Sequence, residues 1–281
     1  MIVAPEKKFK KLKNATIAYR EYGAKDGYPV FCMPPWIFSS FIYLPLASVV
    51  NPKIKLISLE FPGWGGSSKL NKGDIDIDTY IDLAKDFINS FGLDNYSLLG
   101  VSYGGVVVQG LIQEGMKAQG VILISTINGG FSLFGDILGK TVIKGARAMQ
   151  KAMRNEKMFK KVMIFARKTL VLFNYDKNRI PYIDLLLEDM GDFSIHEALK
   201  TIYSLNGRSF LSSKMKNTQV LLIRGSRDYF FVKQDMKDIS KYLNNTKVVI
   251  LPKADHDNIV FEPEKCAPYV NEFLDKLLPV D

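Results

Sequence analysis

A glycine-flanked serine lies near the middle of the chain, in the sequence Gly-Val-Ser-Tyr-Gly at residues 100–104. An apolar run, residues 96–99, leads directly into it, and residues 104–114 follow with helical spacing. The same five-residue pattern also arises by chance in glycine-rich turns, so the flanking segments decide its meaning. A sharp turn between a strand and a helix needs small residues, because the two elements crowd together there. The segment therefore predicts a strand, a tight turn and a helix, with the Ser102 hydroxyl presented above a sheet.

Six short apolar runs have the length and composition of buried strands. They are residues Val30–Met33, Ile54–Leu59, Ser97–Leu99, Val121–Ile124, Val220–Ile223 and Val248–Leu251. Helical patterns separate most of them, and the clearest keeps apolar residues on one face from Ile77 to Phe91 and stops at Gly92. Alternating strands and helices predict a parallel sheet covered on both faces. Residues 15–22 alternate less cleanly, and we expect them to add an antiparallel strand at an edge of the sheet.

The alternation of strands and helices breaks after Ile127. From residue 129 to about residue 213 the chain reads as helices only, with several glycines at its start. Helical insertions in α/β proteins commonly lie over the strand ends where ligands bind. We therefore expect residues 1–128 to form the first part of an α/β core, residues 129–214 a helical cap, and residues 215–281 the second part of the core.

The composition excludes several classes of protein. With 281 residues, 47% of them apolar and 24% charged, the chain is an ordinary globular sequence with room for a large core. No stretch reaches the roughly 18 apolar residues that span a bilayer, and the basic N-terminus lacks the apolar core of a signal peptide. We therefore expect a cytoplasmic protein. Cys32 and Cys266 are expected to be buried, reduced thiols, and no paired Cys or His spacing predicts a metal site.

Two further polar residues follow predicted strands directly. Asp228 ends the loop after Val220–Ile223, and His256 ends the loop after Val248–Leu251. The carboxyl ends of parallel strands share one edge of a sheet, so both side chains are expected at the same edge as Ser102. A serine hydroxyl needs a base within hydrogen-bonding reach and a carboxylate that orients this base. The three residues therefore predict a catalytic set of nucleophile, base and orienting acid.

Other candidates for the acid and the base are present. Asp255 and Asp257 are alternatives to Asp228, but neither follows a strand so directly. The second histidine, His196, lies in the expected cap beside Ser194, where it is interpreted as a residue at the start of a helix.

The chain order serine, aspartate, histidine resembles that of the α/β-hydrolase superfamily. Residues 59–67, Leu-Glu-Phe-Pro-Gly-Trp-Gly-Gly-Ser, resemble the family's loop after the strand that precedes the serine turn, with Glu60 where aspartate is usual. Val260–Glu264, followed by an apolar helix to Leu278, resembles the segment after the family's histidine. The resemblance covers nearly the whole chain. It implies a mostly parallel, eight-stranded sheet flanked by helices, with an inserted helical cap and no cofactor.

Acyl transfer needs two backbone N–H groups that bind the developing oxyanion. The resemblance gives the first to Tyr103, which follows the serine, and places Pro34 and Pro35 where the family has His-Gly. Neither proline carries an N–H, so Trp36 is the expected second donor, and a shift of one residue would put Pro35 there instead. Trp36, Phe38 and Phe41 are expected to line an acyl pocket, with ordinary core packing as the alternative.

The expected cap carries a strong positive charge. Between residues 140 and 168 there are ten basic residues and one acid, a net charge of +9 that equals the net charge of the whole chain. One interpretation is a solvated helix face above an apolar face. The other is an amphipathic lid that binds an anionic membrane surface. Nucleic acid is not an expected partner, because no recognition motif accompanies the charge.

Together these features predict a carboxylesterase, lipase or thioesterase that cleaves esters or thioesters through an acyl-enzyme, with lipid-like acyl substrates expected. Two alternatives stay open. Pro34 and Pro35 favour a weak or inactive enzyme that binds a ligand, and the same triad serves carbon–carbon bond hydrolases and peroxidase-like enzymes. We expect a small-molecule acyl substrate and a monomer or homodimer.

Overall fold

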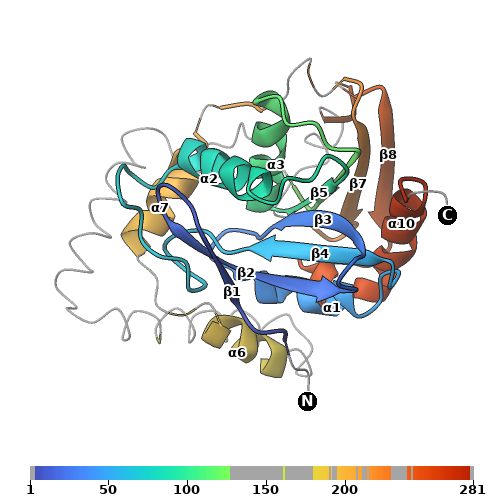
Figure 1. Ribbon diagram of the computed structural model, residues 1–281. Coiled ribbons are helices and arrows are strands. Elements are labelled where there is room, and N and C mark those ends of the chain that lie inside the picture. The colour runs from blue at the N-terminus through green and yellow to red at the C-terminus, as the bar shows by residue number, and fades with distance from the viewer. Residues whose placement is uncertain are drawn as a thin grey trace.

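A computed structural model describes residues 4–126, 161, 180–189, 191, 195–206, 208–210, 214, 216–228, 239–241 and 243–278. The described residues form one sheet with helices on both faces (Figure 1). Its strands are β1 (Lys8–Lys11), β2 (Thr16–Gly23), β3 (Tyr28–Met33), β4 (Ile54–Leu59), β5 (Ser97–Val101), β6 (Gly120–Ile124), β7 (Gln219–Gly225) and β8 (Asn245–Leu251). The helices are η1 (Ser40–Tyr43), α1 (Leu44–Ala47), α2 (Ile77–Asn89), α3 (Tyr103–Gln113), α6 (Ile180–Asp189), α7 (Ile195–Tyr203), α9 (Asn258–Phe261) and α10 (Pro263–Asp275).

The eight strands lie in the order β1-β2-β4-β3-β5-β6-β7-β8. Strands β3 to β8 pair in parallel, whereas β1 and β2 pair antiparallel to their neighbours. The predicted mostly parallel, eight-stranded sheet with flanking helices is therefore confirmed, and the six apolar runs all form strands within it.

Two details of the sheet differ from the expectation. The antiparallel strand at residues 16–23 is not an edge, because β1 pairs outside it and forms the edge itself. Lysines surround Phe9 in β1, and Phe9 is 62% exposed, so no apolar alternation marked this strand. At the opposite edge, β8 is half exposed instead of buried, with Val248 and Ile250 facing solvent.

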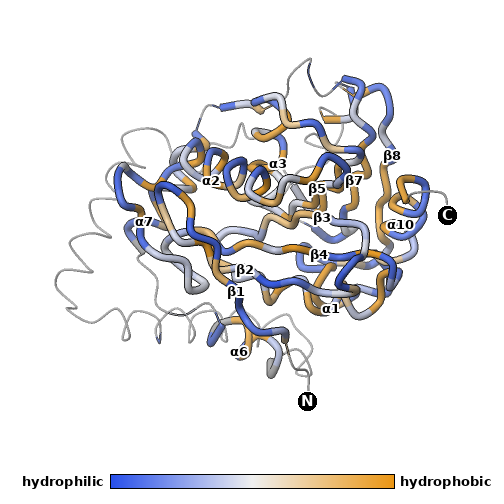
Figure 2. Tube along the Cα trace, in the orientation of Figure 1, coloured by the Kyte–Doolittle hydropathy of each residue, from blue (hydrophilic) through white to orange (hydrophobic). Residues whose placement is uncertain are grey.

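Two apolar cores hold the helices against the sheet. Helices α2 and α3 cover one face, and α1, α9 and α10 cover the other. Figure 2 shows the apolar residues concentrated along the central strands. Helix α2 starts where the side chain of Asp76 accepts a hydrogen bond from the Thr79 N–H at 2.8 Å, and Gly92 with φ +63° follows its end. The predicted helix over this segment is confirmed.

Most of the expected cap, including all but Lys161 of the ten basic residues at 140–168, lies outside the described residues. The described part of that segment contains two helices, α6 and α7. Among the residues that the structure describes, no helix combines the length and the apolar character needed to cross a membrane.

Candidate active site

Ser102 occupies the turn between β5 and α3, as the sequence predicts. Its backbone has φ +53° and ψ −116°, which lies outside the main regions allowed for residues with side chains. Three hydrogen bonds hold this conformation: the Ser102 N–H donates to Ile124 O at 2.9 Å, while Ser102 O accepts from the Gly105 N–H at 3.0 Å and from the Thr126 hydroxyl at 2.9 Å. The turn is therefore strained and held in place by its surroundings, as is common at functional sites.

The glycines around Ser102 are required by close packing of the backbone. A Cβ on Gly104 would overlap the carbonyl oxygen of Met33 and lie 2.6 Å from Pro34 O. A Cβ on Gly100 would lie 2.5 Å from Gly104 O. The first turn of α3 is thus pressed against the end of β3, which brings Tyr103 close to the proline loop.

The structure pairs His256 with Asp228. The imidazole Nδ1 lies 3.0 Å from Asp228 Oδ2, and the carboxylate is fully buried while the imidazole is 24% exposed. A buried carboxylate on Nδ1 holds the ring in one orientation and stabilises its protonated form. The carboxylate that the structure places against His256 is that of Asp228, the residue predicted from its strand-end position.

The Asp228 loop is fixed through its main chain. The Asp228 N–H donates to Gly225 O at 3.2 Å, and the Arg224 guanidinium donates to the Asp228 carbonyl oxygen. The neighbouring loop lies close, since the Arg227 N–H donates to Ala254 O at 2.9 Å. The two loops that carry acid and base therefore support each other.

The strand register brings Ser102, Asp228 and His256 to the same side of the sheet, where the parallel strands have their carboxyl ends. Val101 pairs with Ile124, Ile124 pairs with Ile223, and two residues further along β7 Gly225 pairs with Leu251. Ser102 directly follows β5, and the Asp228 and His256 loops directly follow β7 and β8. Nucleophile, acid and base thus leave the same end of adjacent parallel strands.

Asn258 supports the histidine loop, and sequence reasoning missed it. Its buried side chain donates to Ser125 Oγ at 3.1 Å and to Asp255 O at 2.9 Å, and it accepts from the Cys266 thiol at 3.2 Å. Burial raises the pKa of this thiol to about 12. Cys32 and Cys266 are both buried and not joined to each other, which agrees with the expected free thiols.

Trp36 follows the two prolines in a tight turn that the Phe38 N–H closes on Pro35 O at 3.1 Å. Within this turn Ile37 has φ +58°, a rare conformation for a β-branched residue. The Trp36 indole N–H donates to Ala198 O at 2.9 Å and to Thr201 Oγ1 at 3.1 Å, both in α7. The indole therefore points to a helix of the expected cap.

The three aromatic residues predicted to line a pocket lie in different surroundings. Trp36 and Phe38 are half-buried. Phe41 is buried, with its ring 5.3 Å from the ring of Tyr182 in α6. Tyr103 is the first residue of α3, where a helical N–H has no acceptor within its own helix. The roles of these residues in binding substrate and oxyanion remain predictions.

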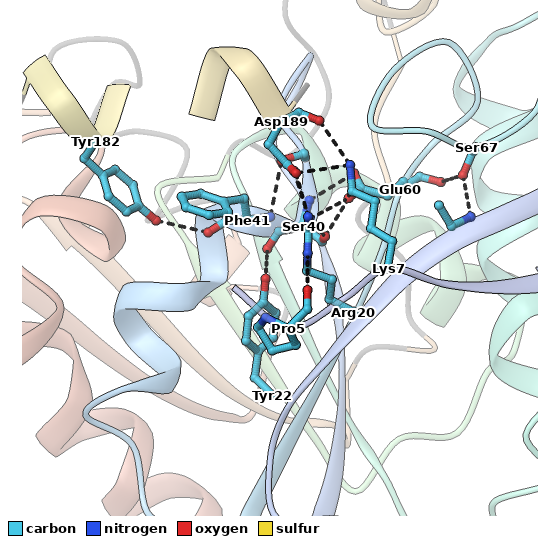
Figure 3. Close-up of polar contacts among 12 residues, drawn as sticks. Pro5, Lys7, Arg20, Tyr22, Ser40, Phe41, Glu60, Ser67, Tyr182 and Asp189 are labelled. Atoms are coloured by element: carbon cyan, nitrogen blue, oxygen red, sulfur yellow. Dashed lines mark hydrogen bonds and ion pairs between the residues drawn. The ribbon is translucent and has the colours of Figure 1, made fainter. Parts of the chain in front are cut away.

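A buried group of charges surrounds Ser40, the first residue of η1 (Figure 3). The Arg20 guanidinium donates to both carboxylate oxygens of Asp189, at 2.5 and 2.8 Å, and to Ser40 Oγ at 2.9 Å. The Glu60 carboxylate accepts from the Ser40 N–H at 3.0 Å and from its hydroxyl at 2.6 Å. Burial raises the pKa of Glu60 to about 8, against the opposing effects of Lys7 and Ser40. In the sequence, only the position of Glu60 in its glycine-rich loop hinted at this group.

Among the described residues, no three His, Cys, Asp or Glu side chains are placed to hold a metal ion. The site offers a strained serine, an imidazole paired with a buried carboxylate, and a helix N-terminus next to the serine. This set can activate a hydroxyl as a nucleophile and transfer its proton.

Known proteins share this arrangement of elements. A family model described as the alpha/beta hydrolase fold matches residues 36–263. An esterase from Thermogutta terrifontis matches with a TM-score of 0.72 and 17% identity, over 97% of this chain and 99% of its own. The esterase EaEST from Exiguobacterium antarcticum matches with a TM-score of 0.73 and 17% identity, over 93% of this chain and 96% of its own. A bromoperoxidase from Bacillus anthracis matches with a TM-score of 0.75 and 19% identity, over 96% of this chain and 100% of its own. The search of curated proteins gives no match.

Proposed function

Because this chain belongs to the alpha/beta hydrolase fold family, we propose that it is a serine hydrolase that cleaves a carboxylic ester or thioester through an acyl-enzyme. The observation that carries the proposal is the 3.0 Å pairing of the His256 imidazole with the buried Asp228 carboxylate, at the sheet edge that also bears the strained Ser102. A carboxylate–imidazole pair next to a serine is the arrangement that activates a hydroxyl.

The proposed reaction has two stages. Ser102 Oγ attacks the carbonyl carbon while His256 Nε2 accepts the hydroxyl proton, and Asp228 stabilises the imidazolium that forms. The oxyanion is bound by the backbone N–H groups of Tyr103 and Trp36. The imidazolium then protonates the leaving alcohol or thiol, and a water molecule activated by the same imidazole hydrolyses the acyl-serine ester.

Esters are the favoured substrates because two structural neighbours are esterases, although the likeness is one of fold. Half-buried aromatic side chains at Trp36 and Phe38 provide an apolar wall for an acyl chain beside the proposed oxyanion donors. The basic residues of the segment 140–168 extend the proposal to lipid-like esters at an anionic membrane surface. Preferred turnover of medium-chain esters and binding to anionic vesicles are the expected results.

A second candidate function is ligand binding without useful turnover. Pro34 and Pro35 support it, since two consecutive residues without an N–H stand where the family has oxyanion-loop residues. A protein that only binds a ligand does not need Ser102, His256 and Asp228 to transfer a proton. Peroxidase-like chemistry is a further alternative, favoured by the fold shared with the bromoperoxidase.

The test is hydrolysis of p-nitrophenyl esters of increasing chain length by the wild-type protein and by Ser102→Ala and His256→Ala. Ser48→Ala is the matched control, because Ser48 is an exposed serine whose hydroxyl donates only locally, to Pro45 O at 2.7 Å. We expect turnover in the wild type and in Ser48→Ala, and its loss in both triad variants. Equal turnover by Ser102→Ala would refute the proposal, and no turnover by folded wild-type protein would favour the ligand-binding alternative.

A further inference from the structure

Thr201 in α7 is fully buried, and its hydroxyl joins the helix to the loop that carries Trp36. The hydroxyl accepts the Trp36 indole N–H at 3.1 Å and donates to Ala198 O at 2.7 Å. Ala198 O also accepts from the indole at 2.9 Å. One indole proton is therefore shared by two acceptors of the same helical turn, which fixes the direction of the ring.

The buried Tyr103 hydroxyl lies near the Thr201 hydroxyl but forms no hydrogen bond with the described residues. Burial raises the pKa of the Tyr103 phenol well above its usual value, and the neighbouring Thr201 hydroxyl opposes this effect. Trp36 and Tyr103 are the two residues whose backbone N–H groups form the proposed oxyanion hole. Thr201 is thus in reach of the side chains of both.

The loop that carries Trp36 needs support from outside. Ile37 has φ +58°, and a β-branched residue keeps this conformation only where the surrounding structure enforces it. Beyond Ile37, the loop is held by Glu60, which accepts from the N–H and the hydroxyl of Ser40. On the Trp36 side, two indole hydrogen bonds tie the loop to α7, and Trp36 and Ile37 also pack against the apolar core.

Helix α7 is itself anchored to the core, so it can serve as this support. Near its end, Ser204 Oγ accepts from the Ile77 N–H at 2.9 Å, at the start of α2. Lys200 forms an ion pair with Asp74 at 2.6 Å in the segment before α2. Figure 1 shows α7 next to the N-terminal end of α2. Because α7 is held in this way, its hydrogen bonds to the indole also hold the ring of Trp36 in place.

We propose that Thr201 is a positioning residue for the oxyanion hole: by fixing the Trp36 indole beside Tyr103, it sets the spacing of the two backbone donors. A helix of the expected cap then controls the rate of the chemical step in addition to covering the site. A displacement of α7 would release Trp36 and open the oxyanion hole. This inference rests on the proposed function.

The test compares Thr201→Val, which keeps the branched shape and loses the hydroxyl, with Thr201→Ser, which keeps the hydroxyl. With p-nitrophenyl acetate, whose acyl group is too short to depend on the cap, we expect kcat of Thr201→Val to fall about 10-fold with KM unchanged, because the donors lose their alignment. Thr201→Ser restores kcat. Ser48→Ala is the control: Ser48 is exposed, its hydroxyl donates to Pro45 O at 2.7 Å, and this variant keeps the wild-type kcat.

A second readout is independent of activity. The chain has two tryptophans, Trp36 and Trp64, so the emission of Trp36 is obtained by subtracting the spectrum of Trp36→Phe from that of the wild type. Thr201→Val removes one of the two acceptors of the indole N–H and leaves Ala198 O, and we expect this loss to shift the Trp36 emission to shorter wavelength. Trp36→Phe removes the indole donor and leaves Thr201 unchanged, so we expect its kcat to fall as well. In the double variant Trp36→Phe/Thr201→Val, we expect little further loss of kcat.

The outcomes separate the inference from the proposed function. If wild-type protein hydrolyses the ester and Thr201→Val shows the emission shift with an unchanged kcat, the inference is overturned while the proposed function stands. If Thr201→Val does not fold, Trp36→Phe provides the test instead. An unchanged kcat in that variant also overturns the inference. If wild-type protein hydrolyses no ester, the proposed function fails and the inference falls with it, whatever the emission spectra show.

Discussion

Replacing the strained Ser102 by glycine is expected to stabilise the protein relative to replacing it by alanine. A backbone with φ +53° and ψ −116° costs about 1–3 kcal/mol in any residue that has a Cβ. Glycine avoids this strain but loses about 0.4–1 kcal/mol through the greater freedom of its unfolded chain. Both variants lack the hydroxyl, so their difference isolates the backbone. The balance favours Ser102→Gly over Ser102→Ala by about 1 kcal/mol.

Thermal or urea unfolding followed by circular dichroism measures this difference. For a chain of this size 1 kcal/mol corresponds to about 2–3 °C in Tm. Ser90 provides the matched pair, because it ends α2 with φ −66° and ψ −10°, an ordinary helical conformation. There Ser90→Gly should be less stable than Ser90→Ala. If Ser102→Gly is also less stable than Ser102→Ala, the turn stores no strain and this reasoning is wrong.

Three further predictions follow from the site and its surroundings. Asp228→Asn should lower kcat about 10⁴-fold with little change in KM, because the amide selects the wrong tautomer of His256; steady-state kinetics would contradict this if activity persisted. Gly104→Ala should destabilise the protein by about 3 kcal/mol in urea unfolding, because its Cβ overlaps Met33 O; a near-neutral effect would show that α3 can move away from β3. The pKa of Glu60 is raised from 4.5 to about 8 in the folded protein, so Glu60 takes up a proton on folding between these pH values. Its contribution to the free energy of unfolding is therefore complete below pH 4.5 and is lost as the pH rises towards 8. Unfolding free energies between pH 5 and 8 should therefore fall by up to about 1.4 kcal/mol per pH unit more in the wild type than in Glu60→Gln, and equal slopes would contradict the raised pKa.

The sequence predicts this fold well where the signal is local. A strand, a turn and a helix in direct succession predict the turn at Ser102, and the strand-end positions of Asp228 and His256 follow from short apolar runs. Each of these patterns spans only a few residues. Parallel strands then bring the three residues to one edge without any further information.

What the sequence does not reveal depends on contacts between distant residues. The Trp36 indole reaches Thr201 across 165 positions, and Arg20 reaches Asp189 across 169. No local pattern marks either pair. The edge strand β1 was missed for a different reason: both of its faces are largely exposed, so its lysine-rich sequence lacks the apolar alternation by which strands are predicted.

Covalent labelling by a fluorophosphonate tests the central claim most directly, because the reagent reacts only with a serine that its site has activated. Intact-mass measurement and peptide mapping of the folded protein should show one adduct, located on Ser102. Ser102→Ala should not be labelled, His256→Ala should be labelled far more slowly, and Ser48→Ala should react like the wild type. A folded wild-type protein that takes up no label, or takes it up at another residue, would contradict the account.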